Sequence, residues 1–479
     1  MPPIAELSAA GLARRIREGR LSATTVVDAF LDRIAARNDR TNAFVTVTDE
    51  HARAAAREAD HAIEQGEPLG PLHGVPVAVK DLNDVAGLRT TSGSLLFEDR
   101  VAESTDPFAQ RLVDAGAIVI GKTNTPEFGL GCTTDNRVVG PTGTPFAPDR
   151  IAGGSSGGAA AALADRLVPL AQGSDTGGSI RTPSSCCNVF GLKPTFGRVP
   201  ITDERNRFAH HTPFSHVGPM ARTVEDAALM LDVMAGPHPD DPFSLPEPTT
   251  DYVAATARTV DDLTVAYSPN LGSYPVSESV RDVVDDAVEA FEVAGASVER
   301  ADPALGHTQA EILDAYYTFA TVLWEGLFDT LAGEGLDPRG ADRDRLAGST
   351  VETILEADEV STRELTAAQR TRTDVQAAFA DLFDEYDLLV CPTLSVPPFE
   401  IGELPTEVAG ESIEPRRGWL LTQPFNMTGQ PVGALPAGLT DEGLPVGMQL
   451  VGPRLAEGDV LAASAALERV RPWGDVYPS

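Results

Sequence analysis

Residues 151–195, IAGGSSGGAAAALADRLVPLAQGSDTGGSIRTPSSCCNVFGLKPT, contain two glycine-flanked serine clusters, GGSSGG at residues 153–158 and GSDTGGS at residues 173–179. Glycine at this density lets the backbone approach a ligand or another segment closely. In the second cluster, successive N–H groups can point into one concavity and receive a developing oxyanion, with a serine presented beside them. The stretch is therefore typical of acyl transfer, although either cluster alone would also suit a tight Gly/Ser turn.

A serine nucleophile needs a base, and the usual base is a histidine oriented by a carboxylate. The histidines offer no such pattern, because no GxSxG nucleophile elbow is present and His210, His211 and His216 cluster in a segment expected to be a polar loop. Lys80 is the alternative, because it ends the apolar run VPVAVK, where burial disfavours an ammonium and lowers its pKa. Lys80 therefore becomes the candidate base, although a lysine at a strand end also commonly forms a plain ion pair.

The composition is strongly acidic. The 479 residues include 71 Asp and Glu against 37 Lys and Arg, which gives a formal charge of -34. A surface this negative repels phosphate backbones and anionic lipid, so we expect neither nucleic acid nor a membrane as a partner. Lysine occurs only at Lys80, Lys122 and Lys193. Acid excess with lysine depletion is typical of proteins that work in concentrated salt, so we expect a halophilic protein.

The pattern of apolar residues predicts an α/β protein with a covered sheet. Helices are expected at residues 22–38, 277–295 and 457–471, and buried strands at residues 75–81, 117–122, 263–268, 387–393 and 445–452. Two Pro-rich acidic segments, residues 236–251 and 393–415, could be linkers, but sequence motifs lie on both sides of each. We therefore expect one large domain.

One motif is misleading. Residues 116–123, GAIVIGKT, match the GxxxxGK[ST] pattern of a phosphate-binding loop. The four middle residues are themselves an apolar strand pattern and Pro126 follows closely, whereas a phosphate-binding loop needs a glycine-rich turn and a helix that opens at the lysine. We therefore do not expect nucleotide binding.

The four cysteines, Cys132, Cys186, Cys187 and Cys391, show neither a disulfide framework nor metal-ligand spacing. This usage fits a reducing compartment. No run approaches about 18 apolar residues, and the N-terminal segment lacks the apolar core of a signal peptide. We expect a cytoplasmic protein.

At this point a family resemblance becomes specific. The segments GGSSGG, GSDTGGSIR and GLKPT, with VPVAVKD upstream, resemble the amidase signature family. GKTNTPEFGLG, GPMARTVEDAALML, PFNMTGQP and LPVGMQLVG are similar to further family segments, so the resemblance covers about residues 5–473. It implies a large mixed central β-sheet covered on both faces by helices, an α/β/α sandwich. It also implies one domain with N-terminal helices in residues 1–65, a catalytic core in 66–235 and a variable substrate-pocket region in 307–412.

The resemblance implies a role for each residue of the two clusters and for Lys80. Ser179 would be the nucleophile, Ser155 would pass protons, and Lys80 would be the base, with a cis peptide bond between Gly154 and Ser155. The implied oxyanion hole consists of the N–H groups of Thr176, Gly177, Gly178 and Ser179. Water would then hydrolyse the acyl-serine, and the reaction would need no metal and no organic cofactor.

Other residues receive supporting or substrate-binding roles. Asp175 and Arg181 would orient the oxyanion loop, and Ser174 would contact the proton relay. The substrate-binding candidates are Cys132, Thr133, Ser174 and Trp419. Further aromatic candidates for the pocket wall are Tyr316, Tyr317, Phe319 and Trp324. Lys122 and Lys193 are expected to be structural, as are Cys186 and Cys187, which lie among small apolar residues.

Three functions remain open from the sequence. The first is a standalone amidase that cleaves an amide to a carboxylate and ammonia or an amine. The second is the A subunit of the tRNA-dependent amidotransferase, which releases ammonia from glutamine for a partner protein. Against it, Thr182 stands where that family branch typically has Gln, residues 214–216 differ, and Trp419 replaces a typical Asp. Trp419 favours a small-to-medium neutral amide, aromatic amides included, because an indole offers an apolar wall. The third function, a non-catalytic scaffold, is disfavoured because Lys80, Ser155 and Ser179 are all present. A homodimer is compatible with the resemblance.

Overall fold

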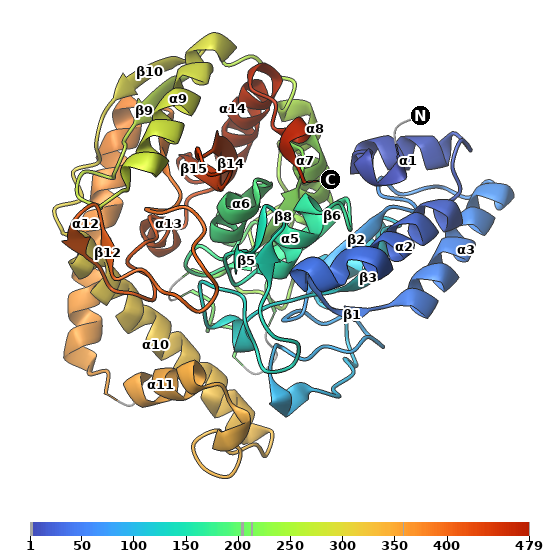
Figure 1. The fold of residues 1–479 in the computed structure, drawn as a ribbon, viewed down its shortest axis with the longest axis horizontal. Helices are drawn as coiled ribbons and strands as arrows, with labels where there is room; N and C mark the ends of the chain where they lie inside the picture. The colour runs from blue at the N-terminus through green and yellow to red at the C-terminus, as the bar shows by residue number, and fades with distance from the viewer. Residues whose placement is uncertain (1–2, 203–205, 212–213, 358, 479) are drawn as a thin grey trace.

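The computed structural model describes residues 3–202, 206–211, 214–357 and 359–478 (Figure 1). Its centre is one 11-stranded sheet. From one edge to the other, the strands are β1 (Phe44–Val47), β3 (Ile118–Thr123), β2 (Pro76–Lys80), β6 (Leu170–Asp175), β8 (His216–Ala221), β7 (Phe190–Lys193), β14 (Val432–Leu439), β15 (Pro445–Val451), β11 (Leu388–Pro392), β9 (Thr264–Tyr267) and β10 (Ser297–Arg300). Strands from both halves of the chain thus share one sheet. Two small two-stranded sheets accompany it, one of β4 (Gly143–Thr144) with β5 (Ala147–Ile151) and one of β12 (Glu407–Val408) with β13 (Glu411–Ser412).

The central sheet is mixed, as the family resemblance implies. Strand β2 pairs in parallel with β3 and with β6, and β9 pairs in parallel with β10 and β11. The strands between these groups pair in antiparallel fashion, from β6 through β8, β7, β14 and β15 to β11. Lys80 is the last residue of β2 and Asp175 is the last residue of β6. Because β2 and β6 are parallel neighbours, their carboxyl ends deliver Lys80 and the second serine cluster to the same edge of the sheet.

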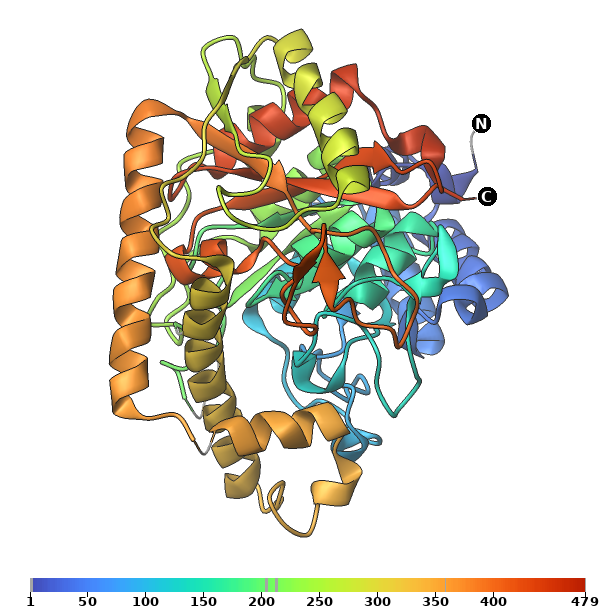
Figure 2. The ribbon, with the colours of Figure 1, turned by 60° about the vertical axis from the view of Figure 1, so that its left-hand side comes forward.

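Helices cover both faces of the sheet. Figure 2 shows α9 (Glu278–Ala294) and α14 (Glu457–Val470) above β14 and β15, with α5 (Gly157–Ala164) and α6 (Arg181–Cys187) below them. Helix α5 consists only of Gly, Ala and Leu, and every residue in it is buried. A Cβ on Gly158 would lie 2.2 Å from the backbone nitrogen of Asn124. The small residues therefore let α5 lie directly against neighbouring backbone.

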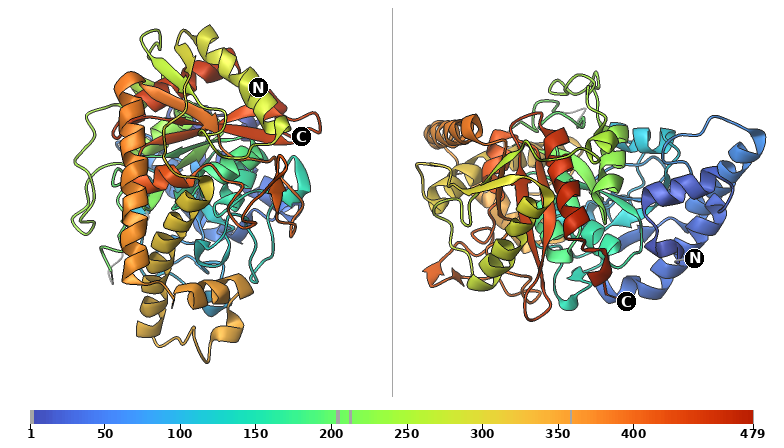
Figure 3. Two further views of the ribbon diagram at one scale, coloured as in Figure 1. Left: turned by 90° about the vertical axis from the view of Figure 1, so that its left-hand side faces the viewer. Right: turned by 90° about the horizontal axis from the view of Figure 1, so that it is seen from above.

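The remaining helices lie at the two ends of the molecule and on the sheet itself, where α7 packs against β8 (Figure 3). Figure 3 shows α2 and α3 at one end and α12 at the other. These helices are α1 (Ala9–Arg17), α2 (Ala23–Thr41), α3 (Asp49–Gln65), α4 (Pro107–Asp114), α7 (Val224–Met234), α8 (Tyr252–Ala255), α10 (Gln309–Gly333), α11 (Gly348–Ala357), α12 (Thr362–Glu385) and α13 (Gln423–Thr428).

The three expected helices and five expected strands are confirmed. Helix α2 begins after Ser22, whose hydroxyl accepts a hydrogen bond from the Thr25 N–H, and α9 begins after Ser277, which caps in the same way. Helix α9 ends at Gly295, which has the left-handed conformation that glycine allows. Residues 118–123 of the GAIVIGKT segment form β3, so Lys122 lies within a strand rather than opening a helix. This confirms that the segment is not a phosphate-binding loop.

Helices α10 and α12 pack against each other and, with α11, extend beyond the sheet at the lower left of Figure 1. Both long helices begin with a capping box, formed by Thr308 with Glu311 and by Ser361 with Glu364. Within the described ranges, no helix has the length and apolarity needed to cross a bilayer.

Candidate active site

Lys80 lies at the centre of a cluster of three serine hydroxyls. Its Nζ atom is 2.7 Å from Ser155 Oγ, 2.9 Å from Ser156 Oγ and 3.0 Å from Ser174 Oγ. The side chain has no exposed surface. Burial lowers the pKa of Lys80 from its ordinary 10.5 to about 7, and the Asp175 carboxylate only partly opposes this shift. A large neutral fraction of the amine is therefore present near neutral pH, which a base requires.

The hydrogen bonds distinguish the three serines. The Ser156 hydroxyl donates to the Ser174 carbonyl oxygen at 3.3 Å, so its single proton is already used and it accepts from Lys80. A neutral amine donates two protons and accepts one. If Ser156 and Ser174 accept the two donated protons, Ser155, at the shortest distance, is the hydroxyl that donates to the Lys80 lone pair. Ser156 was not among the predicted site residues, although the doubled serine in GGSSGG could have suggested it.

The Gly154–Ser155 peptide bond is cis, as the resemblance implies. Close packing surrounds it: a Cβ on Gly154 would lie 2.7 Å from the Thr133 carbonyl carbon and 2.9 Å from that of Cys132. The backbone of Cys132 and Thr133 therefore lies directly against this bond. Both residues are partly exposed, so they are accessible from solvent beside the serine cluster.

Ser179 lies on the tight connection between β6 and α6. The Ser156 N–H donates to the Ser179 carbonyl oxygen at 3.1 Å, which joins the two serine clusters. Lys80 and Ser155 are buried, whereas Ser179 and Gly177 are partly exposed. Ser179 is thus the more accessible hydroxyl of the predicted triad, as a nucleophile must be.

Asp175 and Arg181 hold the connection between β6 and α6 in place through hydrogen bonds. The Asp175 carboxylate accepts hydrogen bonds from the Gly178 N–H at 2.8 Å and the Ile180 N–H at 3.1 Å, and it pairs with Arg181 through two contacts of 3.0 Å. Burial by itself would raise the pKa of Asp175, but the Arg181 guanidinium outweighs burial and holds the pKa far below its usual range. The carboxylate therefore stays ionised and holds the loop in place.

The Gly178 N–H is directed at Asp175, so it is engaged within the loop rather than presented to a ligand. Thr422 adds a second support, because its hydroxyl donates to the Gly177 carbonyl oxygen at 2.6 Å. Of the four predicted oxyanion donors, Thr176, Gly177 and Ser179 remain without such an internal acceptor in the described hydrogen bonds. The sequence could not show this division, because every residue of the loop carries the same N–H group.

Trp419 does not occupy the position predicted for it. Its side chain has no exposed surface, its Nε1–H donates to the Pro415 carbonyl oxygen at 3.1 Å, and it packs edge-on against Phe399 with ring centres 5.0 Å apart. A ligand cannot reach this indole, so the structure does not support the predicted wall. The physical reason is that burying an indole removes a large apolar area from water, and here Pro415 and Phe399 cover it. A residue that was not predicted for the site is Arg417, two positions earlier, which is partly exposed.

The other lysines and the histidines form separate contacts. Lys122 is fully buried, 2.8 Å from Thr90 Oγ1 and 3.7 Å from Asp81 Oδ1. Lys193 lies 3.2 Å from His216 Nε2. The prediction that His216 lies in a polar loop is wrong. His216 is the buried first residue of β8, because its backbone pairs with Asp175 of the neighbouring strand β6.

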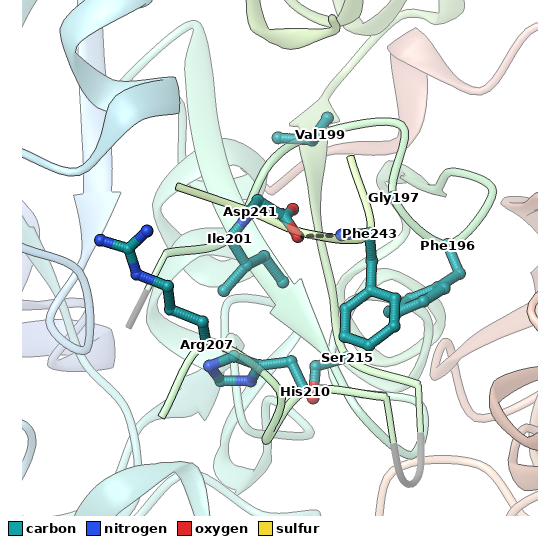
Figure 4. A pocket seen from close by; sticks show the side chains of 9 residues that line it. All are labelled: Phe196, Gly197, Val199, Ile201, Arg207, His210, Ser215, Asp241 and Phe243. Atoms are coloured by element: carbon teal, nitrogen blue, oxygen red, sulfur yellow. Dashed lines mark hydrogen bonds between the residues drawn. The ribbon is translucent and has the colours of Figure 1, made fainter. Parts of the chain in front are cut away.

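A small cavity lies beside the oxyanion loop (Figure 4). Its lining includes Ser215, whose hydroxyl is 3.1 Å from that of Thr176, together with the rings of Phe196 and Phe243. The cavity volume of about 10 Å³ has room for about one water molecule, so it is not a substrate pocket. In the described part of the chain, no group of three or more His, Cys, Asp or Glu side chains could hold a metal ion.

The site thus combines a buried amine, a cluster of serine hydroxyls and a glycine-rich loop with partly exposed residues. Comparison with known proteins identifies the family. The Amidase family profile matches residues 25–461, so the chain belongs to the amidase signature family and is a hydrolase acting on amide C–N bonds.

Individual relatives are similar over nearly their whole lengths. An acylamidase of Rhodococcus erythropolis is 40% identical over 99% of this chain and 97% of its own. The A subunit of a glutamyl-tRNA(Gln) amidotransferase from Thermosynechococcus vestitus is 34% identical, with 98% of each chain covered. Among solved structures, a bacterial aryl acylamidase of the amidase signature family superimposes with a TM-score of 0.95 at 36% identity, covering 99% of this chain and 98% of that one. The family and the mixed, two-face-covered sheet expected from the sequence are thereby confirmed.

Proposed function

We propose that the chain cleaves its amide through an acyl-serine formed on Ser179. Neutral Lys80 takes the proton of Ser155, Ser155 takes the proton of Ser179, and the Ser179 oxygen attacks the amide carbonyl carbon. The reverse transfers protonate the leaving nitrogen as the C–N bond breaks. Water, activated by the same relay, then attacks the acyl-serine and releases the carboxylate. Each step moves protons only between hydroxyls, the amine, water and substrate.

The observation that supports this mechanism most is the 2.7 Å contact between buried Lys80 and Ser155. The neighbouring Ser156 hydroxyl already donates its proton to the Ser174 carbonyl oxygen. The oxyanion would be held by the N–H groups of Thr176, Gly177 and Ser179, and a well-placed donor of this kind contributes about 3–4 kcal/mol in the transition state. The Gly178 N–H serves indirectly, since it anchors the loop on Asp175.

We further propose that the chain works as a standalone amidase rather than within an amidotransferase complex. The acylamidase relative is 40% identical, against 34% for the amidotransferase relative. Thr182, in place of a typical Gln, and the loss of a typical Asp at Trp419 support the same choice. The names of the acylamidase and aryl acylamidase relatives favour an N-acyl amine as substrate over glutamine.

The test is release of ammonia or amine by the purified chain alone. A panel of glutamine, asparagine, aliphatic amides and anilides should show turnover of at least one simple amide without any added protein. If simple amides stay intact and glutamine is hydrolysed only after a partner protein is added, the chain belongs to an amidotransferase complex instead.

The acidic composition leads to a separate proposal, that the folded enzyme is adapted to concentrated salt in a reducing cytoplasm. The formal charge of -34 produces self-repulsion that about 1 M salt screens over roughly 3 Å. We expect the melting temperature and the activity to rise together between 0.1 M and about 2 M KCl. Thermal unfolding at matched protein concentrations measures this, and equal stability in dilute buffer and in molar KCl would contradict it. We also propose that residues 5–473 fold as one domain and that two copies of the chain form a homodimer.

A further inference from the structure

Arg417 lies on the segment between β13 and α13, against three aromatic side chains of α10. Its guanidinium carbon is 4.6 Å from the ring centre of Tyr317, 4.9 Å from that of Trp324 and 6.0 Å from that of Tyr316. Aromatic rings attract a guanidinium through its flat faces, whereas its N–H groups radiate from its edge. The aromatic contacts therefore hold the group in place without using its N–H donors, of which one reaches the Cys132 thiol.

This aromatic cluster borders the candidate active site. The Tyr316 hydroxyl packs on Gly177 so closely that a Cβ there would lie 2.2 Å from it. Arg417 also lies beside the Cys132 thiol, and the Cys132 backbone packs on Gly154. One phenol ring thus separates the guanidinium from the oxyanion loop. A group bound at Arg417 would belong to the same molecule whose carbonyl lies at Ser179.

Among the residues that the structure describes, no carboxylate forms an ion pair with Arg417, and its guanidinium lies among the Tyr317 and Tyr316 rings and the Cys132 thiol. Glu414 accepts a hydrogen bond from the Arg417 backbone N–H at 2.7 Å, but its ion pair is with Arg416 at 3.3 Å. Arg416 pairs with Glu356 as well, at 3.0 Å. Glu414 also accepts from the Tyr317 hydroxyl at 3.2 Å. In a chain with 71 acidic and 37 basic residues, an arginine that has no carboxylate ion pair and lies beside the active site is suited to an anionic ligand.

We propose that Arg417 binds a carboxylate of the substrate, so that the preferred amides are anionic. This inference rests on the proposed function, because it names the substrate class of that same site. A planar guanidinium matches a carboxylate through two parallel N–H···O bonds, and the surrounding rings exclude water from the contact. The proposal replaces the neutral amide that the sequence suggested through Trp419. The carboxylate is carried either by the acyl group or by the leaving amine, and the substrates below separate the two.

The experiment compares charged and neutral amides of similar size with the purified full chain. Succinamate and glutaramate, against butyramide and valeramide, test a carboxylate on the acyl group. Para-acetamidobenzoate, against para-methylacetanilide, tests a carboxylate on the leaving amine. We expect the wild type to favour the anionic member in one of these sets. In Arg417→Met, the anionic-to-neutral ratio of kcat/KM should fall about 10- to 100-fold, as for a lost hydrogen-bonded charge pair.

Arg416→Met is the matched control, because it removes a neighbouring guanidinium whose partners are Glu356 and Glu414. It should leave the ratio within about twofold of the wild type. Arg417→Lys keeps the charge without the two-pronged geometry and should give an intermediate ratio. A wild type that favours the neutral members, or a ratio that Arg417→Met leaves unchanged, overturns the proposal.

A binding measurement in the Ser179→Ala protein avoids dependence on turnover. Glutarate or para-aminobenzoate, titrated at constant salt, should raise the melting temperature of Ser179→Ala and of Ser179→Ala/Arg416→Met but not of Ser179→Ala/Arg417→Met. The absence of a shift in all three proteins counts against the carboxylate site. Failure of the proposed mechanism has a different signature, namely amide turnover that survives Ser179→Ala.

Discussion

Replacement of Ser179 by alanine is expected to lower kcat for amide hydrolysis by about 10⁴- to 10⁶-fold, because the members of a nucleophile relay act as a unit. The side chain is partly exposed and small, so its loss leaves the packing of β6 and α6 in place. Ammonia release under saturating substrate, with the melting temperature measured in parallel, checks this.

Ser184→Ala is the control for this substitution. Ser184 lies on the adjacent helix α6 and its hydroxyl donates to the Ile180 carbonyl oxygen, at 2.9 Å. This variant should retain turnover within a few-fold of the wild type. If Ser179→Ala keeps more than about one hundredth of the wild-type rate in a sample free of other hydrolases, another group is the nucleophile.

The second large effect is on pH dependence. With the pKa of Lys80 lowered to about 7, kcat/KM for an uncharged amide should rise about tenfold per pH unit below 7 and level off above it. The direction follows from the base role, since only the neutral amine accepts the Ser155 proton. Initial rates from pH 5 to 9 at constant ionic strength measure this profile.

Lys80→Met provides the control, because its residual rate should lack the rise. This matters because Asp106 and Glu468, whose pKa values burial raises to about 6 and about 7, titrate in the same range without contacting the serine cluster. A wild-type profile that is flat between pH 5 and 7 would exclude Lys80 as the base.

The lowered pKa of Lys80 also affects stability. Between pH 7 and 10.5 the unfolded chain binds the Lys80 proton and the folded chain does not, so this residue makes the free energy of unfolding rise with pH over that window.

Much of the fold follows from local patterns. The helices α2 and α9 were predicted within a few residues, because their apolar spacing, serine caps and terminal residues lie within the helices themselves. The order of strands in the sheet could not be predicted from spacing alone, since β7 pairs with β14, which lies more than 200 residues later in the chain. Only the family resemblance supplied the mixed sheet.

The candidate site divides in the same way. The sequence singled out Lys80 because lysine is so scarce in this chain, and it singled out the serine clusters because glycine surrounds them. It placed His216 in a loop because its polar neighbours hide a strand whose partner, β6, is distant in sequence. It selected Trp419 as a pocket wall because this residue stands where the amidotransferase subunit typically has Asp, and residue type alone does not show that the indole faces the interior.

By itself, then, the sequence determined which chemical groups are present and the α/β class of the fold. Acidic composition, three lysines, glycine-flanked serines and the alternation of strands and helices are properties of residue type and short spacing. The tertiary structure alone decided how those groups are used. It placed Ser155 against a lysine 75 residues away, used the Ser156 proton on Ser174, turned the Gly178 N–H toward Asp175 and brought Arg417 among the rings of α10. The physical reason is that hydrogen bonds and charge pairs depend on distances of about 3 Å between atoms, and such distances between remote segments are set only when the whole sheet and its helices have packed.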